Sequence, residues 1–119
     1  MDRKALKQQY KETVHPMGVF RVFNTANEKS FIGTSTNIPA MLNRQKAQLQ
    51  MGAHPVAALQ SDWNSLGPDV FTFETLDTIQ PKDTPGYDPA DDLRVLEELW
   101  LDRLSPFDDR GYNPRPKKN

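Results

Sequence analysis

Two short β-rich runs joined by a polar link constrain the fold of this chain most strongly. The runs are GVFRVFN (residues 18–24) and SFIGTS (residues 30–35), and the link between them is TANEK. Links of this length join neighbouring antiparallel strands, so the pattern predicts a β-hairpin. The first run places apolar side chains at both odd and even positions, which predicts that both faces of the strand are covered. The hairpin therefore predicts a sheet that lies between helices.

The rest of the chain supplies those helices and one further strand. The expected elements are a helix from an Asn37 cap to Gly52, a helix opened by Pro55, a strand over 70–79, and a helix from an Asp88 cap to about Leu104. The fold class is therefore α/β, a small sandwich in which helices cover a three-stranded, mainly antiparallel sheet. We expect an N-terminal helical arm (1–16), one domain (17–113) and a basic, disordered tail (114–119).

Length and composition exclude several classes of chemistry. A chain of 119 residues is the size of one domain. It has no cysteine and only two histidines, which excludes cysteine nucleophiles, zinc ribbons, iron–sulfur clusters and a histidine cage. A metal would therefore need mainly oxygen ligands. The sequence has no run of 18 apolar residues and starts with a polar segment, so we expect neither a membrane span nor a secretory signal, and a cytoplasmic protein.

The net charge of −1 conceals an uneven distribution of charge along the chain. Residues 1–50 carry a net +5, residues 51–109 a net −10, and residues 110–119 a net +4. A bulk electrostatic argument for nucleic acid binding therefore fails, although a local basic face remains open. The acidic stretch 62–109 is a candidate surface for a protein partner, because it would repel DNA.

Five short motifs occur in a characteristic order. They are Gly18-Val19-Phe20, Phe31-Ile32-Gly33, Gly52-x-His54, Glu97-x-x-Trp100 and Gly111-Tyr112-Asn113. In order, spacing and element type, the chain over residues 17–113 resembles the GIY-YIG nuclease domain. The resemblance implies hydrolysis of DNA phosphodiesters with one divalent ion, Mg²⁺ or Mn²⁺, held by a helix glutamate that Glu97 matches. Asn113 matches a position of the family pattern near the site.

The sequence departs from the family pattern at three catalytic positions. Phe20 and Phe31 stand where the family has its two motif tyrosines, so both hydroxyl groups are missing. Met41 stands where the family arginine would fall, and a thioether cannot neutralise a phosphate. The glycines of both motifs, Gly18 and Gly33, are retained. The pattern therefore predicts an impaired nuclease.

A few other residues are candidates for the remaining chemistry. On a helical projection Glu97 lies about 55° from the centre of the apolar stripe and Glu98 about 155°, so Glu97 should face inward. Arg44 lies one turn beyond Met41 and is the candidate substitute for the missing arginine, although an exposed arginine on a helix is more often simply solvated. His54 precedes a helix start, where it could cap the helix, bind phosphate or assist proton transfer. The candidate nucleic acid contacts are Arg21, Arg44 and Lys46.

Three functions stay open on the sequence alone. The first is a protein with the nuclease fold that has lost most of its catalytic groups and keeps weak nucleic acid contact. The second is a slow metal-dependent DNA endonuclease that uses Glu97, Arg44 and His54. The third is a protein-interaction module on the same scaffold.

Overall fold

The computed structural model describes residues 15–80 and 85–115. Almost all of the expected N-terminal arm and the last four residues of the expected basic tail lie outside these described ranges. The expected domain over residues 17–113 falls within them, apart from residues 81–84 in the loop that follows the third strand.

The sheet has three strands, β1 (Met17–Asn24), β2 (Lys29–Ser35) and β3 (Phe71–Ile79), in the order β2-β1-β3. Both pairings are antiparallel, which confirms the predicted hairpin and sheet type. In this register Val22 lies opposite Phe31 on one side and Phe73 on the other. Val19 pairs with Asp77 but Phe20 pairs with Thr75, so Leu76 is the extra residue of a β-bulge.

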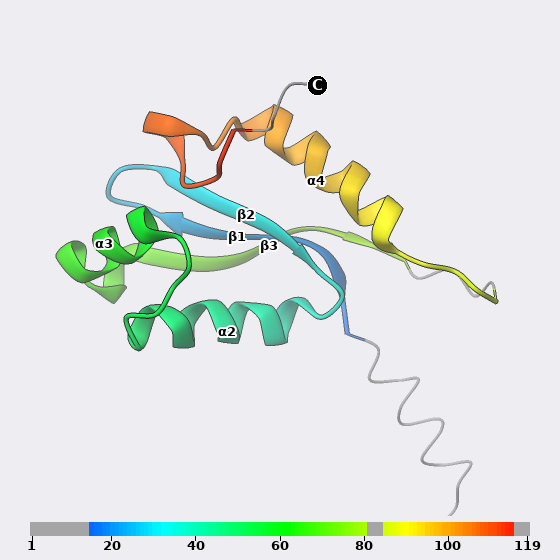
Figure 1. Cartoon of the computed structure of the whole chain (residues 1–119), viewed down its shortest axis with the longest axis horizontal. Coiled ribbons are helices and arrows are strands. Elements are labelled where there is room, and N and C mark those ends of the chain that lie inside the picture. Colours follow the sequence, from blue (N-terminus) through cyan, green and yellow to red (C-terminus); the bar gives the residue numbers. More distant parts are fainter. Residues whose placement is uncertain (1–14, 81–84, 116–119) are drawn as a thin grey trace, which may run out of the picture.

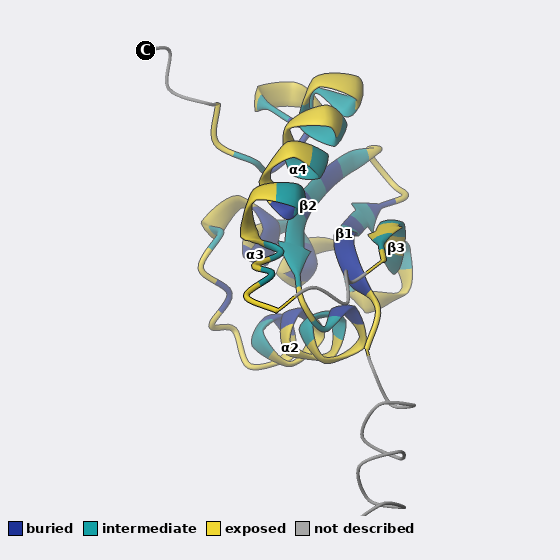
Figure 2. Cartoon of the chain, turned by 90° about the vertical axis from the view of Figure 1, so that its right-hand side faces the viewer, coloured by how far each residue is buried: buried dark blue, intermediate teal, exposed yellow. Residues whose placement is uncertain are grey.

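Helices cover both faces of this sheet, as the sequence predicts. Helices α2 (Ile38–Gln50) and α3 (Ala57–Leu66) lie on one face, and α4 (Ala90–Leu104) lies on the other (Figure 1). The main core lies between the sheet and the first two helices, and it contains Val22, Leu49, Leu59, Trp63 and Phe71. Figure 2 shows the buried residues concentrated along the strands and the inner faces of the helices. No helix in the described part of the chain is long and apolar enough to cross a membrane.

The element boundaries differ from the predicted ones by one or two residues. The Asn37 cap is confirmed, since its side chain accepts a hydrogen bond from the Ala40 amide at 3.1 Å. Helix α3 begins at Ala57 rather than at Pro55, because Val56 has an extended backbone conformation and takes the cap position. Helix α4 begins at Ala90, and Pro89 takes the cap position predicted for Asp88.

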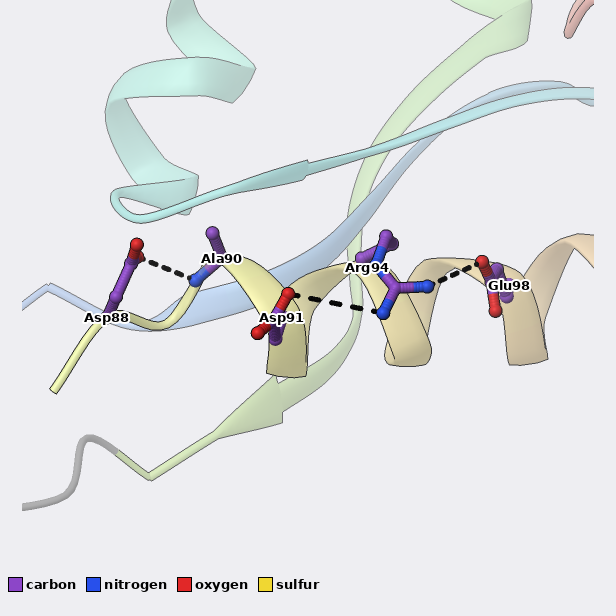
Figure 3. Close-up of polar contacts among 5 residues, drawn as sticks. All are labelled: Asp88, Ala90, Asp91, Arg94 and Glu98. Carbon is purple, nitrogen blue, oxygen red and sulfur yellow. Dashed lines mark hydrogen bonds and ion pairs between the residues drawn. The ribbon is translucent and has the colours of Figure 1, made fainter.

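Two further boundary details concern the start of α4 and the hairpin. The Asp88 carboxylate still accepts a hydrogen bond from the Ala90 amide at 2.9 Å, as Figure 3 shows. Asp88 therefore binds an amide of the first turn although it lies one residue before the cap position. The hairpin link is one residue shorter than expected, because Lys29 already belongs to β2. The predicted end of the last helix at Leu104 is confirmed.

Candidate active site

The two motif glycines lie where neighbouring atoms of the sheet leave no room for a side chain. A Cβ atom on Gly33 would come within 2.8 Å of the Phe20 ring, because Phe20 pairs with Gly33 across the hairpin. A Cβ atom on Gly18 would lie 2.0 Å from the Asp77 carbonyl oxygen, and the Gly18 φ of +157° also favours glycine. Both glycines therefore have a packing role that does not require catalysis.

The two phenylalanines at the tyrosine positions are packed against one another beneath the sheet. Their ring centroids are 6.2 Å apart at an interplanar angle of 65°, and only 3% of Phe20 is exposed. Phe31 in turn meets the imidazole ring of His54 edge-on at 5.6 Å. Both rings lie on the face covered by α2 and α3, since Phe31 packs against the main core. These positions contribute aromatic packing and offer no proton donor.

His54 is the centre of a buried polar network. Its Nδ1 atom accepts a hydrogen bond from the Val56 amide at 3.0 Å, so the proton of the neutral ring resides on Nε2. That Nε2 donates to the Gln45 Oε1 atom at 2.5 Å. Burial lowers the pKa of His54, which favours the neutral ring. Both ring nitrogens are therefore engaged in structural hydrogen bonds, but the predicted helix cap is not formed, because Val56 is the cap residue of α3 and no described side chain caps this helix.

Two glutamines complete this network, and the sequence analysis did not anticipate them. The Gln45 amide donates to the Met41 sulfur atom at 3.5 Å. Gln60 accepts from the His54 amide at 3.0 Å and donates to the Leu49 carbonyl oxygen at 3.0 Å. Gln45 lies four residues before Leu49, on the apolar stripe of α2. This helical spacing is the one sequence feature that indicates a buried position for Gln45. Met41 is therefore joined to His54 through Gln45.

Glu97 lies on the opposite side of the sheet from these rings, because it belongs to α4. It is half-buried while Glu98 is exposed, which confirms the predicted orientation. Burial, assisted by the charge of Glu98, raises the pKa of the Glu97 carboxyl above its ordinary value. Within residues 15–80 and 85–115, no hydrogen bond or ion pair holds this carboxylate, and no group of three or more acidic or histidine side chains forms a metal cluster.

The basic candidates lie in two different settings. Arg44 and Lys46 are exposed on α2, and no described residue forms a hydrogen bond or ion pair with either of them. Arg21 points from β1 and binds Glu74 on the neighbouring strand at 2.6 Å, with its guanidinium 4.3 Å from the centre of the Phe23 ring. The charge of Arg21 is thus largely matched inside the protein, whereas Arg44 and Lys46 face solvent.

Asn113 closes the outer edge of β2. Its carboxamide oxygen accepts from the Ile32 amide at 2.9 Å, and its carboxamide nitrogen donates to the Ile32 carbonyl at 2.8 Å, as a neighbouring strand would. The preceding Gly111 forms a parallel bridge with Ser30 and has no room for a side chain, because a Cβ atom would lie 2.2 Å from the Pro106 oxygen. The closing tripeptide therefore pairs with the sheet edge.

Tyr112 anchors this closing segment from the other side. Its hydroxyl donates to the Asp62 carboxylate at 2.6 Å and accepts from the Asn24 side chain at 3.0 Å. Burial and the Asp62 contact raise the pKa of Tyr112 to about 12. The hydroxyl is therefore protonated at neutral pH and holds the C-terminal segment against β1 and α3.

Comparisons with known proteins agree with this architecture. A solved structure described as the catalytic domain of the homing endonuclease I-TevI is 25% identical, with a TM-score of 0.69, over 84% of this chain and 99% of that domain. A glutamate-to-alanine variant of the same domain is 24% identical, with a TM-score of 0.67, over 82% of this chain and 92% of that one. No protein-family profile matches the chain, and no curated protein matches it. The chain thus has a GIY-YIG-like fold, that of a nuclease catalytic domain.

Proposed function

We propose that this chain is a GIY-YIG-like protein whose hydrolytic chemistry is lost or severely reduced, and that it keeps weak contact with nucleic acid through α2. The observation that carries the proposal is the pair of phenyl rings, Phe20 and Phe31, packed on each other and on His54. A phenyl ring in the core has no hydroxyl group, so it can neither activate water nor protonate a leaving group. General acid–base groups contribute roughly 10²- to 10⁴-fold to hydrolytic rates, so their loss alone is severe.

The other catalytic positions of the family pattern support the same proposal. Met41 offers a thioether, which accepts a hydrogen bond from Gln45 and provides no positive charge to a phosphate. The carboxamide of Asn113 is committed to the backbone of Ile32 through both its oxygen and its nitrogen. Loss of one charge-stabilising donor costs about 10²- to 10³-fold in rate, and this loss adds to that of the two hydroxyls.

The described residues fit a resident divalent ion poorly. Mg²⁺ binds through one or two carboxylates together with water and substrate phosphates, and here Glu97 stands as a single carboxylate with a raised pKa. Within the part of the chain that the structure describes, no group of three or more acidic or histidine side chains comes together that could hold an ion. We therefore assign no metal-dependent step to this site.

Residual nucleic acid contact is supported by the charge of α2. This helix carries Arg44 and Lys46 and no acidic residue, and both basic side chains are exposed. Two phosphate contacts would give a slope of about −1.8 in a plot of log affinity against log salt. Such contacts are independent of sequence, so the proposal expects weak and unselective binding.

The test combines a cleavage assay with a binding assay. Purified wild-type protein and the Glu97→Ala variant are each incubated with supercoiled plasmid and Mg²⁺ or Mn²⁺. We expect the wild type to nick the plasmid no more than the variant does. Binding of a labelled DNA duplex is then measured over a range of salt for the wild type, the Arg44→Ala/Lys46→Ala variant and an Arg94→Ala control on α4. We expect the salt slope to fall only in the α2 variant. Cleavage that Glu97→Ala abolishes would overturn the loss of activity.

A slow metal-dependent endonuclease is the second candidate, and one observation favours it. Glu97 is a half-buried carboxylate with a raised pKa and no hydrogen bond or ion pair to a described residue, which is an arrangement typical of functional acids. In this alternative Glu97 binds Mg²⁺ or Mn²⁺ and Arg44 contacts a phosphate, while His54 assists proton transfer. This alternative predicts that Arg44→Ala loses most of the cleavage activity. Equal cleavage rates in the wild type and Arg44→Ala would show that Arg44 does not contact the phosphate during cleavage.

A further inference from the structure

The outward side of α4 carries an exposed apolar pair. Val95 and Leu99 stand one helical turn apart, with 57% and 50% of their surfaces exposed. Acidic side chains lie beside this pair, and on the helical projection Asp92 and Asp102 are each about 40° from its centre. Leu93, on the inward side of the same helix, is buried. The helix therefore presents an apolar and acidic surface away from the sheet.

Both basic residues of this acidic flank of α4 are already engaged within the helix, Arg103 over an aromatic ring and Arg94 by carboxylates. Arg94 contacts Glu98 at 3.1 Å and Asp91 at 4.0 Å, and Figure 3 shows its guanidinium between the two carboxylates. Asp102 is exposed, and no hydrogen bond or ion pair from a described residue reaches its carboxylate. The flank as a whole therefore keeps an excess of negative charge.

A cavity of about 270 Å³ opens at the end of this surface. It is lined by Glu98, Leu101, Asp102, Ser105 and Phe107. Leu101 and Phe107 are half-buried apolar groups, while Glu98 and Asp102 bring exposed carboxylates. The Phe107 ring already holds one guanidinium, since that of Arg115 lies 5.6 Å from the ring centre and pairs with Asp108.

We propose that this surface of α4, defined by Val95, Leu99 and the cavity residues, docks a basic segment of a partner protein with one arginine side chain in the cavity. The hydrocarbon stem of the arginine would lie along Leu101 and Phe107, and its planar head would meet the carboxylates of Glu98 and Asp102. Apolar residues that flank the arginine in the partner would cover Val95 and Leu99.

Charge decides between the classes of macromolecule that could bind here. A nucleic acid phosphate would meet the negative charge of Asp91, Glu98 and Asp102, against two guanidinium groups of α4 that side chains of the same helix already engage. A basic protein segment has the complementary charge. This surface of α4 contains no residue of the candidate active site, so partner binding here does not depend on the proposed function.

The test uses a capped synthetic peptide in which one arginine is flanked by leucines a helical turn away. The control peptide has citrulline in place of arginine, which keeps the shape and removes the charge. Binding is measured by fluorescence anisotropy, and the site is located by amide chemical shifts in the full chain. We expect Asp102→Asn to weaken binding of the arginine peptide by about tenfold, the scale of a hydrogen bond to a charged group.

Asp69→Asn is the matched control, because it removes the same charge from an exposed aspartate on the 3₁₀ turn Pro68–Val70, outside α4. We expect it to leave the affinity unchanged and the citrulline peptide to bind at least tenfold more weakly, by the same argument. Equal effects of the two substitutions, or equal affinity for the two peptides, would overturn the proposal. The proposal would also be overturned if DNA changed the chemical shifts of the same amides. It would be overturned, too, if Lys117→Ala/Lys118→Ala changed the chemical shifts of the cavity amides in the absence of peptide, because the chain's own tail would then occupy the cavity.

Discussion

His54 and Glu97 lie on opposite faces of the sheet, and the protein holds their side chains in opposite ways. On the α2 face, His54 and Gln45 are buried and hydrogen-bonded to one another, and the phenyl ring of Phe31 packs against the imidazole. On the α4 face, Glu97 is half-buried with a raised pKa and has no hydrogen bond or ion pair to a described residue. The hydrogen-bonded His54–Gln45 network is typical of a stabilising core. The half-buried Glu97 carboxylate is typical of a functional group that lowers the stability of the fold. The polar groups around His54 are thus part of the packed interior, whereas the Glu97 carboxylate keeps its charge without a partner among the described residues.

The largest expected effect is on the α2 face. His54→Ala should lower the free energy of unfolding by about 2–4 kcal/mol, because it leaves the Gln45 oxygen and the Val56 amide without their partner and opens a cavity beside Phe31. Urea denaturation at neutral pH measures this loss.

Arg44→Ala on the same helix is the control for His54→Ala, and it should change stability by less than about 0.5 kcal/mol, as exposed substitutions usually do. If the two variants lost the same amount, the network around His54 would have no special structural role, and the contrast between the faces would disappear.

The two aromatic positions should differ from one another in a second experiment. Phe20→Tyr should cost about 1–3 kcal/mol, because only 3% of Phe20 is exposed and the new hydroxyl would lose its hydrogen bonds to water. Phe31→Tyr should cost less than about 1 kcal/mol, since Phe31 is only partly buried and water can reach the new hydroxyl.

Thermal unfolding of these two variants gives the comparison, with the wild type as the reference. Equal stability of Phe20→Tyr and the wild type would show that the core has kept space for a hydroxyl. The α2 face would then be an incompletely filled site, and a test for recovered cleavage in the double variant would follow.

The sequence predicts those features that depend on neighbours in the chain. The hairpin, the Asn37 cap and the inward orientation of Glu97 all follow from local periodicity, and all three are confirmed. The pairing of Asn113 with Ile32 spans 81 residues and has no local pattern, so the sequence could not supply it. The partners of His54 were missed for the same reason, because a buried glutamine satisfies its hydrogen bonds through residues that helical periodicity does not identify.

Acid titration sharpens the comparison further. The folded-state pKa of His54 is lowered by burial, so the unfolded chain binds the proton more readily. The contribution of the neutral ring is fully present above the unfolded value of about 6.5, and it is lost as the pH falls through the folded-state pKa. The stability difference between the wild type and His54→Gln should therefore shrink as the pH falls below about 6.5. A difference that stays constant from neutral pH to pH 5 would show that His54 does not titrate with folding.

The smallest expected effect belongs to Glu97 and has the opposite sign. A carboxyl whose folded-state pKa is raised contributes stability that is fully present below its unfolded pKa and is lost as the pH rises through the folded value. At neutral pH the charged form is therefore the unfavourable one, and Glu97→Gln should unfold at the same or a slightly higher urea concentration. Glu98→Gln is the matched control on the same helix, and it should lose a little stability because Glu98 pairs with Arg94. A clear loss of stability in Glu97→Gln would mean that the folded protein holds this carboxylate with a cation, and the contrast between the two faces of the sheet would then fail.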